Sequence, residues 1–424
     1  AMARAGGIGI IHRFMSIEHQ AREVRRVKRA EALVVEHPAT LLPTATVAAA
    51  RAAMEQHGIG GLIVIGTDNT VLGIVTRRDI MFHEPDDEDT PVSAVMTSGK
   101  DLITAPKGTS FEAARAILHK ARVEKLPLVD DDGRLAGLIT AKDVEHLQHY
   151  PNATKDAKGR LRVGAAIGVR PGYLRRAEAL LEAGVDALVV DIAHGHSTNA
   201  VDAASELRGR FGEGWQLVIG NVATREGTQR LIDAGADAVK VGVGPGSICI
   251  TRLVTGFGVP QLSAIAEASE AAAPSGVPII ADGGIRNSGD IVKALAAGAQ
   301  TVMIGSLLAG TRESPGMVVQ RNGRRYKLTR GMASLGATID RDSSEDEAVF
   351  QKREYERVVP EGVEASVPYR GPVEDILHQL VGGLRSGLSY AGALSIGDLE
   401  RAAEFVRLTP AGLKESGPHD VDTL

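Results

Sequence analysis

From residue 160 onward, short apolar runs alternate with longer amphipathic segments rich in Ala, Leu and Arg. Each apolar run ends in a small or polar residue, which is typical of buried strands in a parallel sheet, and the longer segments predict helices. The expected strands are 164–168, 187–191, 217–221, 238–242, 278–282 and 301–306. Helices are expected over 174–183 and 289–297, and a further strand (7–12) and helix (16–30) open the chain.

Strands that alternate with helices predict a parallel α/β sheet. The six strands after residue 160 and the one at 7–12 make seven, whereas a (β/α)8 TIM barrel needs eight. We therefore predict a barrel whose first strand precedes residue 1 of this sequence. An open, doubly wound sheet is the alternative. The barrel is expected to comprise 1–31 and 150–424.

Residues 32–149 contain an internal repeat. Gly73–Asp79 reads Gly-Ile-Val-Thr-Arg-Arg-Asp and matches Gly137–Asp143, which lies 64 residues further on (137 − 73). Each copy has an apolar helix, two strands and a second helix that starts near the aspartate. Neither copy could bury its strands alone, so we expect the two, about 32–90 and 91–149, to pack as a pair.

The carboxyl ends of barrel strands meet at one mouth, where barrel enzymes place their functional groups. This rule brings together Asp191, Asn221, Cys249, Asp282, Gly305 and Ser306. Cys249 is the only cysteine and follows three glycines at alternate positions (242, 244, 246). Glycines let the backbone approach a ligand closely, and a thiol presented there is a candidate nucleophile. A small buried packing residue is the alternative.

Composition narrows the class of protein. The formal net charge of −5 gives no reason to expect a nucleic-acid partner. No apolar run reaches the roughly 18 residues of a membrane span, so we expect no membrane partner. A single cysteine excludes an intrachain disulfide and favours a cytoplasmic setting.

The two repeat copies resemble paired cystathionine-β-synthase (CBS) modules, which often bind adenine or guanine nucleotides. This resemblance implies that the Thr-x-x-Asp end of each copy contacts a ribose. The residues concerned are Thr76, Asp79, Thr140 and Asp143. The alternative, that they only cap the final helix of each copy, stays open.

Five long motifs are similar to those of the IMP dehydrogenase/GMP reductase family, and the similarity extends over almost the whole chain. They lie at 244–252 (Gly-Pro-Gly-Ser-Ile-Cys-Ile-Thr-Arg), 281–286, 303–306, 330–337 and 382–387. The resemblance implies that Cys249 attacks C2 of IMP, that hydride passes to NAD, and that the resulting thioimidate is hydrolysed to XMP. This is the committed step of guanine nucleotide synthesis.

The resemblance also assigns roles at the site. Thr251 and Glu361 would handle water or ammonia, with Glu361 also at the purine edge. The remaining substrate residues would be Ser247, Gly284, Gly305 and Ser306 at the phosphate, Asp282 at the ribose, and Gly331 and Met332 at the base. Asp191 and Asn221 would lie on the cofactor side, unless they are ordinary strand-end residues. Asp282 could instead cap the next helix.

The resemblance also implies a potassium ion that is bound by the backbone carbonyls of Gly244, Gly246 and Cys249. It further implies that the protein is a homotetramer. The catalytic loop would span 242–258 and a flap about 334–360. IMP dehydrogenases carry an Arg-Tyr pair in this flap, and its arginine is the hydrolytic base. Here Ala348 and Val349 occupy that place, and neither side chain can exchange a proton.

Three hypotheses follow from this departure. The first is an IMP dehydrogenase whose hydrolysis relies on Thr251 and Glu361, or on a shifted Arg353. The second is a GMP reductase, which converts GMP to IMP with NADPH and needs no such arginine. The third is a weakly active, nucleotide-binding regulatory protein. The inserted repeat and the 382–387 motif favour the first, and the retention of Cys249, Thr251 and Glu361 argues against the third.

Overall fold

The computed structural model describes residues 1–30, 34–82, 89–345 and 355–417. They form two compact units. The first comprises Ala1–Ile11, Ala21–Gly164 and Glu182–Asp186; the second comprises His12–Gln20, Ala165–Leu181 and Ala187–Leu424. The unit borders do not follow the expected limits 1–31, 32–149 and 150–424, which stay a prediction.

A seven-stranded sheet in the order β1-β9-β10-β11-β12-β13-β14 organises the fold. Its strands are β1 (Gly9–Ile11), β9 (Val163–Ile167), β10 (Ala187–Asp191), β11 (Gln216–Val222), β12 (Ala238–Val241), β13 (Ile279–Asp282) and β14 (Thr301–Met303). Strands β10 to β14 pair with their neighbours in parallel. All seven strands predicted from the apolar runs are therefore present.

One predicted boundary was wrong. We expected a strand over 301–306, but β14 ends at Met303, and Ser306 is the first residue of helix α12 (Ser306–Ala309). Gly305 occupies the position just before this helix. The small residues that end the apolar run thus start a helix instead of continuing the strand, since Gly weakens a strand interior.

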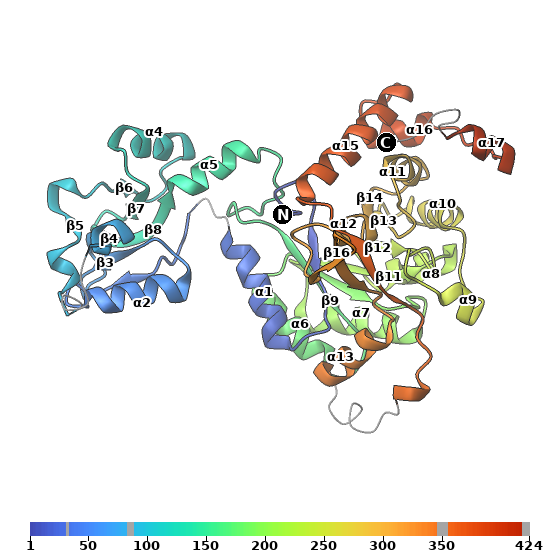
Figure 1. The fold of residues 1–424 in the computed structure, drawn as a ribbon, viewed down its shortest axis with the longest axis horizontal. Helices are drawn as coiled ribbons and strands as arrows, with labels where there is room; N and C mark the ends of the chain where they lie inside the picture. The colour runs from blue at the N-terminus through green and yellow to red at the C-terminus, as the bar shows by residue number, and fades with distance from the viewer. Residues whose placement is uncertain (31–33, 83–88, 346–354, 418–424) are drawn as a thin grey trace. The chain divides into compact units, whose positions relative to one another are not determined.

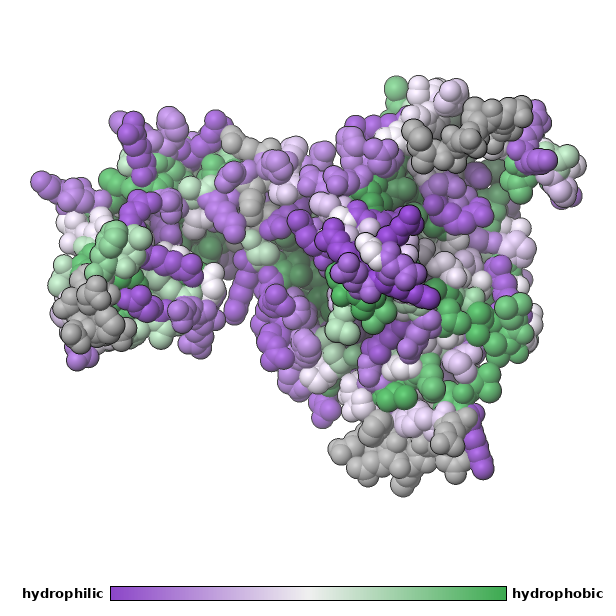
Figure 2. Space-filling model, in the orientation of Figure 1, coloured by the Kyte–Doolittle hydropathy of each residue, from purple (hydrophilic) through white to green (hydrophobic). Residues whose placement is uncertain are grey.

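Helices cover the outer side of strands β10 to β14 (Figure 1). They are α7 (Thr198–Phe211), α8 (Arg225–Asp233), α10 (Gln261–Ala272) and α11 (Ser288–Ala296). Helix α6 (Tyr173–Glu182) and helix α1 (Ile17–Ala30) also match predicted segments. The Ser16 hydroxyl accepts a hydrogen bond from the amide of His19 at 3.2 Å, as a helix cap does. The surface over α1 is hydrophilic (Figure 2).

A three-stranded antiparallel sheet, β15-β16-β17, follows the barrel strands and was not predicted. It comprises Val318–Arg321, Arg324–Arg330 and Glu364–Pro368. Asn322 and Gly323 join the first two strands with φ of 49° and 74°. Both positive values suit a two-residue hairpin turn, for which Asn-Gly is a strong signal. Strand β16 leads directly to Gly331, and β17 begins just after Glu361.

The repeat forms two small sheets of the first unit. The first contains β2 (Thr40–Leu41), β3 (Gly61–Ile65), β4 (Val71–Thr76) and β5 (Thr97–Ser98), and the second contains β6 (Ala105–Pro106), β7 (Lys125–Val129) and β8 (Leu135–Thr140). Their helices are α2 (Val47–His57), α3 (Arg77–Ile80), α4 (Phe111–Ala121) and α5 (Ala141–His149). Gly61 pairs with Thr76 in one copy, and Lys125 pairs with Thr140 in the other. The sequence repeat is therefore also a repeat of strand register.

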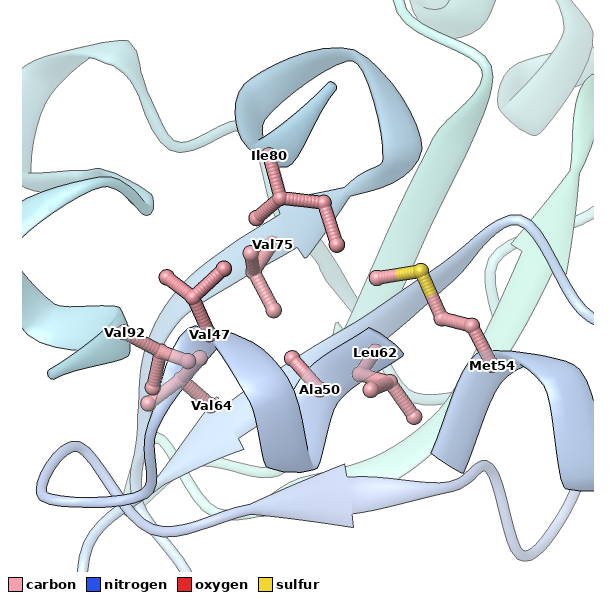
Figure 3. Packing of buried hydrophobic residues seen from close by; sticks show 8 residues of the cluster. All are labelled: Val47, Ala50, Met54, Leu62, Val64, Val75, Ile80 and Val92. Carbon is pink, nitrogen blue, oxygen red and sulfur yellow. The ribbon is translucent and has the colours of Figure 1, made fainter. Parts of the chain in front are cut away.

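Each copy has an apolar core, and the two copies share a third cluster. Figure 3 shows the first core, where α2 places Met54 beside Leu62 of β3 and Val47 near Val64 of the same strand. Ile63, Ile74 and Leu138 form the shared cluster. Burying apolar surface stabilises the folded state by roughly 25 cal/mol per Å². Because the shared cluster takes residues from both copies, each copy is stabilised by packing against the other.

The chain continues through helices α13 (Leu335–Glu345), α15 (Val373–Tyr390), α16 (Ile396–Ala402) and α17 (Pro410–Glu415). Within the described ranges, no helix is long and apolar enough to cross a membrane.

Candidate active site

The loop after β12 presents Cys249. Gly242 has a φ of 150°, and a Cβ atom built on it would lie 2.1 Å from the Asp282 carbonyl oxygen, so only glycine fits there. The thiol is half-buried, and the short helix α9 (Thr251–Thr255) begins two residues later. The loop therefore holds a single reactive group close to the end of β13.

A chain of hydrogen bonds runs from the thiol to a carboxylate. Cys249 Sγ donates to Thr251 Oγ1 at 3.2 Å, and Thr251 Oγ1 donates to Glu361 Oε2 at 2.8 Å. Glu361 lies 110 residues after Thr251 in sequence. The arrangement offers a route for a proton between the thiol and the carboxylate, because the hydroxyl both accepts and donates.

Backbone hydrogen bonds hold these parts together. The Glu361 carbonyl accepts from the amide of Ile250 at 2.9 Å, and the Ile248 carbonyl accepts from the amide of Val363 at 3.1 Å. Gly331 donates to the Val363 carbonyl at 2.9 Å. The predicted base-binding residue Gly331 therefore lies beside the Cys249 loop, and its neighbour Met332 is exposed.

A buried lysine joins three of the predicted residues. Lys240 Nζ donates to Asp191 Oδ1 at 2.8 Å, to Asp282 Oδ2 at 2.6 Å and to Asn221 Oδ1. The Lys240 side chain is only 2% exposed. Burial by itself lowers the pKa of this ammonium, but the charges of Asp191 and Asp282 outweigh it and raise the pKa. The lysine is therefore charged. We call these four residues the Lys240 cluster.

Sequence reasoning missed Lys240. The signal was a single charged residue inside the apolar run 238–243. A lysine is almost never fully buried unless it is paired, so its presence in a strand that is buried throughout already calls for acceptors on the neighbouring strands. On one side Asp191 is the last residue of β10 and Asn221 the last but one of β11, and on the other side Asp282 is the last residue of β13.

Hydrogen bonds at these strand ends bear on two of the alternatives, and the predicted roles stay predictions. Asp282 does not cap the next helix, because Asn287 caps α11 with a side chain that accepts from the amide of Asp290 at 3.0 Å. Asn221 donates to the Gly242 carbonyl at 2.8 Å and to Asp282 Oδ2 at 2.9 Å. Asp191 and Asn221 are therefore parts of a network and not isolated strand ends.

The predicted phosphate residues lie at neighbouring strand ends. Asp282 pairs with Met303, so Gly284 and Gly305 follow adjacent strands. A Cβ on Gly283 would lie 2.9 Å from Pro245 Cγ, which shows how closely the Ser247 loop approaches this turn. Ser247 and Ser306 are exposed.

The predicted potassium ligands belong to one turn of the Cys249 loop. The Gly246 carbonyl accepts a hydrogen bond from the Cys249 amide at 3.1 Å. Such a carbonyl has a second lone pair for a cation, so the turn is compatible with the predicted ion. Its role as a metal site stays a prediction.

In both repeat copies the Thr-x-x-Asp residues bond to each other. Thr76 Oγ1 donates to Asp79 Oδ2 at 2.7 Å, and Thr140 Oγ1 donates to Asp143 Oδ2 at 2.5 Å. The amides of Thr76 and Thr140 donate to the same carboxylate oxygens. The capping interpretation thus describes both contacts, and a ribose contact stays a prediction.

The expected flap is described only in part. Ala348, Val349 and Arg353 lie outside the described residues, as does Phe350-Gln351. On the described side, the buried Asp342 of α13 pairs with Arg170 at 2.9 Å, and Tyr355 donates to Asp342 at 3.4 Å. These contacts fix both sides of the segment that departs from the family pattern.

Comparison with known families matches residues 1–419 to the IMP dehydrogenase / GMP reductase domain. Inosine-5'-monophosphate dehydrogenase of Nitrosopumilus maritimus is 52% identical over 421 residues, which is 99% of this chain and 87% of that protein. The corresponding enzyme of Aquifex aeolicus is also 52% identical, over 99% of this chain and 85% of that protein.

Among solved structures, GMP reductase from Trypanosoma brucei in complex with guanosine 5'-monophosphate superposes with a TM-score of 0.90 at 46% identity. The match covers 99% of this chain and 87% of that one. The same enzyme in complex with guanosine 5'-triphosphate gives 0.78 at 41% identity, over 96% and 85%. This chain belongs to the IMP dehydrogenase/GMP reductase family, and its barrel strands are those of a TIM-barrel fold.

Proposed function

We propose that this chain oxidises IMP to XMP with NAD, through a covalent adduct on Cys249. The observation that carries the proposal is the hydrogen-bonded series from Cys249 through Thr251 to Glu361. Relatives at 52% identity named as IMP dehydrogenases favour oxidation as the direction. The enzyme is thus an NAD-dependent oxidoreductase of purine metabolism.

The first step is attack of the Cys249 thiolate on C2 of IMP, a bond that a thiolate forms readily. The thiol proton passes to Thr251 and on to Glu361, which releases it to solvent. The hydride leaves C2 for the nicotinamide that bound NAD would supply. Water then attacks the thioimidate, and Glu361 takes a water proton through Thr251. The C2–S bond breaks as XMP forms, and Glu361 returns that proton to the Cys249 sulfur. The carboxylate therefore acts as proton acceptor in both halves and loses its proton again after each.

Different residues bind the substrate and the cofactor. Asp282 receives the ribose hydroxyls, while exposed Ser247 and Ser306, with Gly284 and Gly305, surround the phosphate with backbone amides. Gly331, Met332 and Glu361 face the purine. Asp191 and Asn221, at the ends of the two strands preceding β12, bind the cofactor side. Potassium would stiffen the loop through the carbonyls of Gly244, Gly246 and Cys249.

A GMP reductase is the second candidate, because the chain is 46% identical to such an enzyme with a TM-score of 0.90. The departure at Ala348 and Val349 favours it as well, since reduction needs no hydrolytic arginine. In this reaction the Cys249 adduct of GMP loses ammonia and then accepts hydride from NADPH.

One pair of assays separates the two. We expect absorbance of NADH at 340 nm to rise with IMP and NAD, and Cys249→Ser to abolish the rise. NADPH consumption with GMP, without activity on IMP, would identify the reductase instead. Mass spectrometry of the intact protein tests the hydrolysis step, for which the flap lacks the usual Arg-Tyr pair. A stable Cys249 adduct with little turnover would show that hydrolysis of the thioimidate is impaired.

Three further features complete the proposal. An adenine or guanine nucleotide binds the repeat pair at Thr76, Asp79, Thr140 and Asp143; that the related reductase forms a complex with guanosine 5'-triphosphate agrees with a nucleotide ligand of this class. The chain works as a homotetramer, and it acts in the cytoplasm. Nucleotide titration and light scattering test the first two.

A further inference from the structure

We propose that Lys240 is a positioning residue that holds the ribose carboxylate Asp282 in its binding orientation and ties it to the cofactor-side residue Asp191. The inference rests on the proposed function only in taking Asp282 as the group that receives the ribose hydroxyls.

Position and burial support this role. Lys240 lies on β12, the strand between those that carry Asn221 and Asp282. Its ammonium donates to one residue on each of β10, β11 and β13, which uses all three of its hydrogens. No donor is left for a ligand, so the lysine acts through its neighbours.

The neighbours, in contrast, keep oxygen atoms available. The side chains of Asp191 and Asp282 are 33% and 24% exposed, against 2% for Lys240. Each carboxylate has one oxygen on the lysine and a second one that no bond to the lysine occupies. The lysine thereby turns one oxygen of each aspartate inward, and among the described residues no hydrogen bond occupies the other, which can accept from hydroxyl donors.

The lysine also separates two like charges. The Asp191 and Asp282 oxygens lie 2.8 Å and 2.6 Å from the same nitrogen, so they are within about 5.4 Å of each other. Two carboxylates at such a distance hinder each other's ionisation unless a cation stands between them. Asp191 and Asp282 are the titratable groups that act on Lys240, so removing the lysine leaves that pair uncompensated.

The test is IMP affinity of the full-length chain, measured by calorimetry without NAD at pH 8 and pH 6. We expect Lys240→Met to weaken binding by about 10- to 100-fold at pH 8, the effect of losing a charged hydrogen-bond arrangement. The loss relative to wild type should be larger at pH 6, because a proton shared by the carboxylates then competes with the ribose hydroxyls. Affinity within twofold of wild type, or a loss equal at both pH values, would overturn the proposal.

Lys28→Met is the matched control. Lys28 is also buried, at 5% exposed, and also pairs with two aspartates, but neither belongs to the site. Its IMP affinity should equal that of wild type within twofold at both pH values. An equal, pH-dependent loss in this control would mean that the effect is a general one of destabilisation, and would contradict the specific role.

A second comparison serves if Lys240→Met does not fold. Asp191→Asn leaves Lys240 holding Asp282, and its IMP affinity is the reference for the double variant. The double variant Lys240→Met, Asp191→Asn removes one charge of each sign and should bind IMP about tenfold more weakly than Asp191→Asn alone. Equal affinities would overturn the proposal.

These measurements are independent of turnover. A wild-type protein that binds IMP but forms no NADH would contradict the proposed reaction and leave the role of Lys240 open to the same test. If it binds GMP in place of IMP, the titrations are made with GMP, which carries the same ribose. A wild type with affinity for neither nucleotide would overturn the assignment of Asp282 and this inference with it.

Discussion

Two buried lysines in this molecule each pair with two aspartates, yet their surroundings differ. Lys240 pairs with Asp191 and Asp282, and Lys28 pairs with Asp186 at 2.8 Å and Asp156 at 3.0 Å. We call the second group the Lys28 cluster. Both ammonium groups are almost fully buried, so both depend on their carboxylates to offset the cost of leaving water.

The two clusters differ in the hydrogen bonds that their carboxylates accept besides those from the lysine, and in how far the carboxylates are exposed to solvent. Asp186 Oδ2 accepts from the amide of Val163 at 2.8 Å, and Asp156 accepts from the backbone and side chain of Arg160, each at 2.9 Å. The Lys28 cluster is therefore closed by the protein itself. The carboxylates of the Lys240 cluster are about twice as exposed, at 33% and 24% against 17% and 13%. A closed cluster serves stability, and an open one can serve a ligand.

The positions of Asp186 and Asp191 at opposite ends of β10 agree with this difference between a closed and an open cluster. Asp186 immediately precedes β10, and Asp191 ends it. In barrels, conserved chemistry gathers at the carboxyl ends of strands and the opposite ends serve stability. The same pair of residue types thus has two uses, decided by the end of the strand at which it stands.

The largest expected effect is that of Lys28→Met on stability. Removing one partner of a buried ion pair leaves Asp156 and Asp186 without their cation, and we expect a loss of about 3 kcal/mol in the free energy of unfolding. Urea unfolding followed by circular dichroism measures it. Arg26→Met is the control on the same helix, because its pair with Glu23 is exposed and should contribute less than about 0.5 kcal/mol. Equal losses in the two variants would break the comparison.

Gly220→Ala tests the backbone beneath the Lys240 cluster without changing any charge. A Cβ there would lie 2.5 Å from the Lys240 carbonyl oxygen and 2.7 Å from its Cβ. We expect a loss of about 1 to 3 kcal/mol from overpacking, together with weaker IMP binding. Gly209→Ala in α7 meets nothing within 4 Å and should be neutral or stabilising by up to about 1 kcal/mol. Unchanged IMP affinity in Gly220→Ala would show that the cluster tolerates displacement.

The smallest expected effect is the acid response of the Lys28 cluster. Burial alone would raise the pKa of Asp156, but hydrogen bonds from Lys28 and Arg160 outweigh it and lower the pKa to about 2. A depressed carboxyl pKa contributes stability above the unfolded value of 3.8, and this contribution is lost as pH falls toward 2. The contribution is about 1 to 2 kcal/mol.

Unfolding of wild type and Asp156→Asn at pH 5 and pH 2.5 measures this contribution. The variant should be less stable at pH 5, and the gap should narrow at pH 2.5. A gap that stays constant with pH would mean that Asp156 contributes through packing and not through its charge.

Much of the fold was predictable from the sequence because barrel strands are continuous apolar runs with polar ends. The seven strands and the thiol loop follow from this pattern alone. The hairpin at Asn322-Gly323 was missed although its turn residues signal it, because its strands carry many charged residues (Arg321, Arg324, Arg325) and lack a clear apolar alternation.

The candidate site was less predictable in two respects. The contact between Thr251 and Glu361 spans 110 residues, and no local pattern reports such a distance; only the family resemblance brought the two together. Lys240 was missed for another reason. The rule that barrel enzymes place functional residues at the ends of strands does not consider side chains within a strand. A charged residue in a buried strand signals paired acceptors on the neighbouring strands, even when it does not stand at a strand end.

The way in which the flap is attached has a consequence for how this enzyme can change. The Ala333 carbonyl accepts hydrogen bonds from the amides of Glu361 and Gly362, both at 3.1 Å, so the two ends of the intervening chain are pinned together. The entropy of closing such a loop grows only with the logarithm of its length, and doubling it costs roughly 0.6 kcal/mol. A change in the length of the chain between these ends therefore costs little in loop-closure entropy, while Glu361 stays in register with Thr251. In the proposed reaction, the fate of the adduct can thus change through the length of this segment, while the proposed nucleophile and its proton acceptor keep their places.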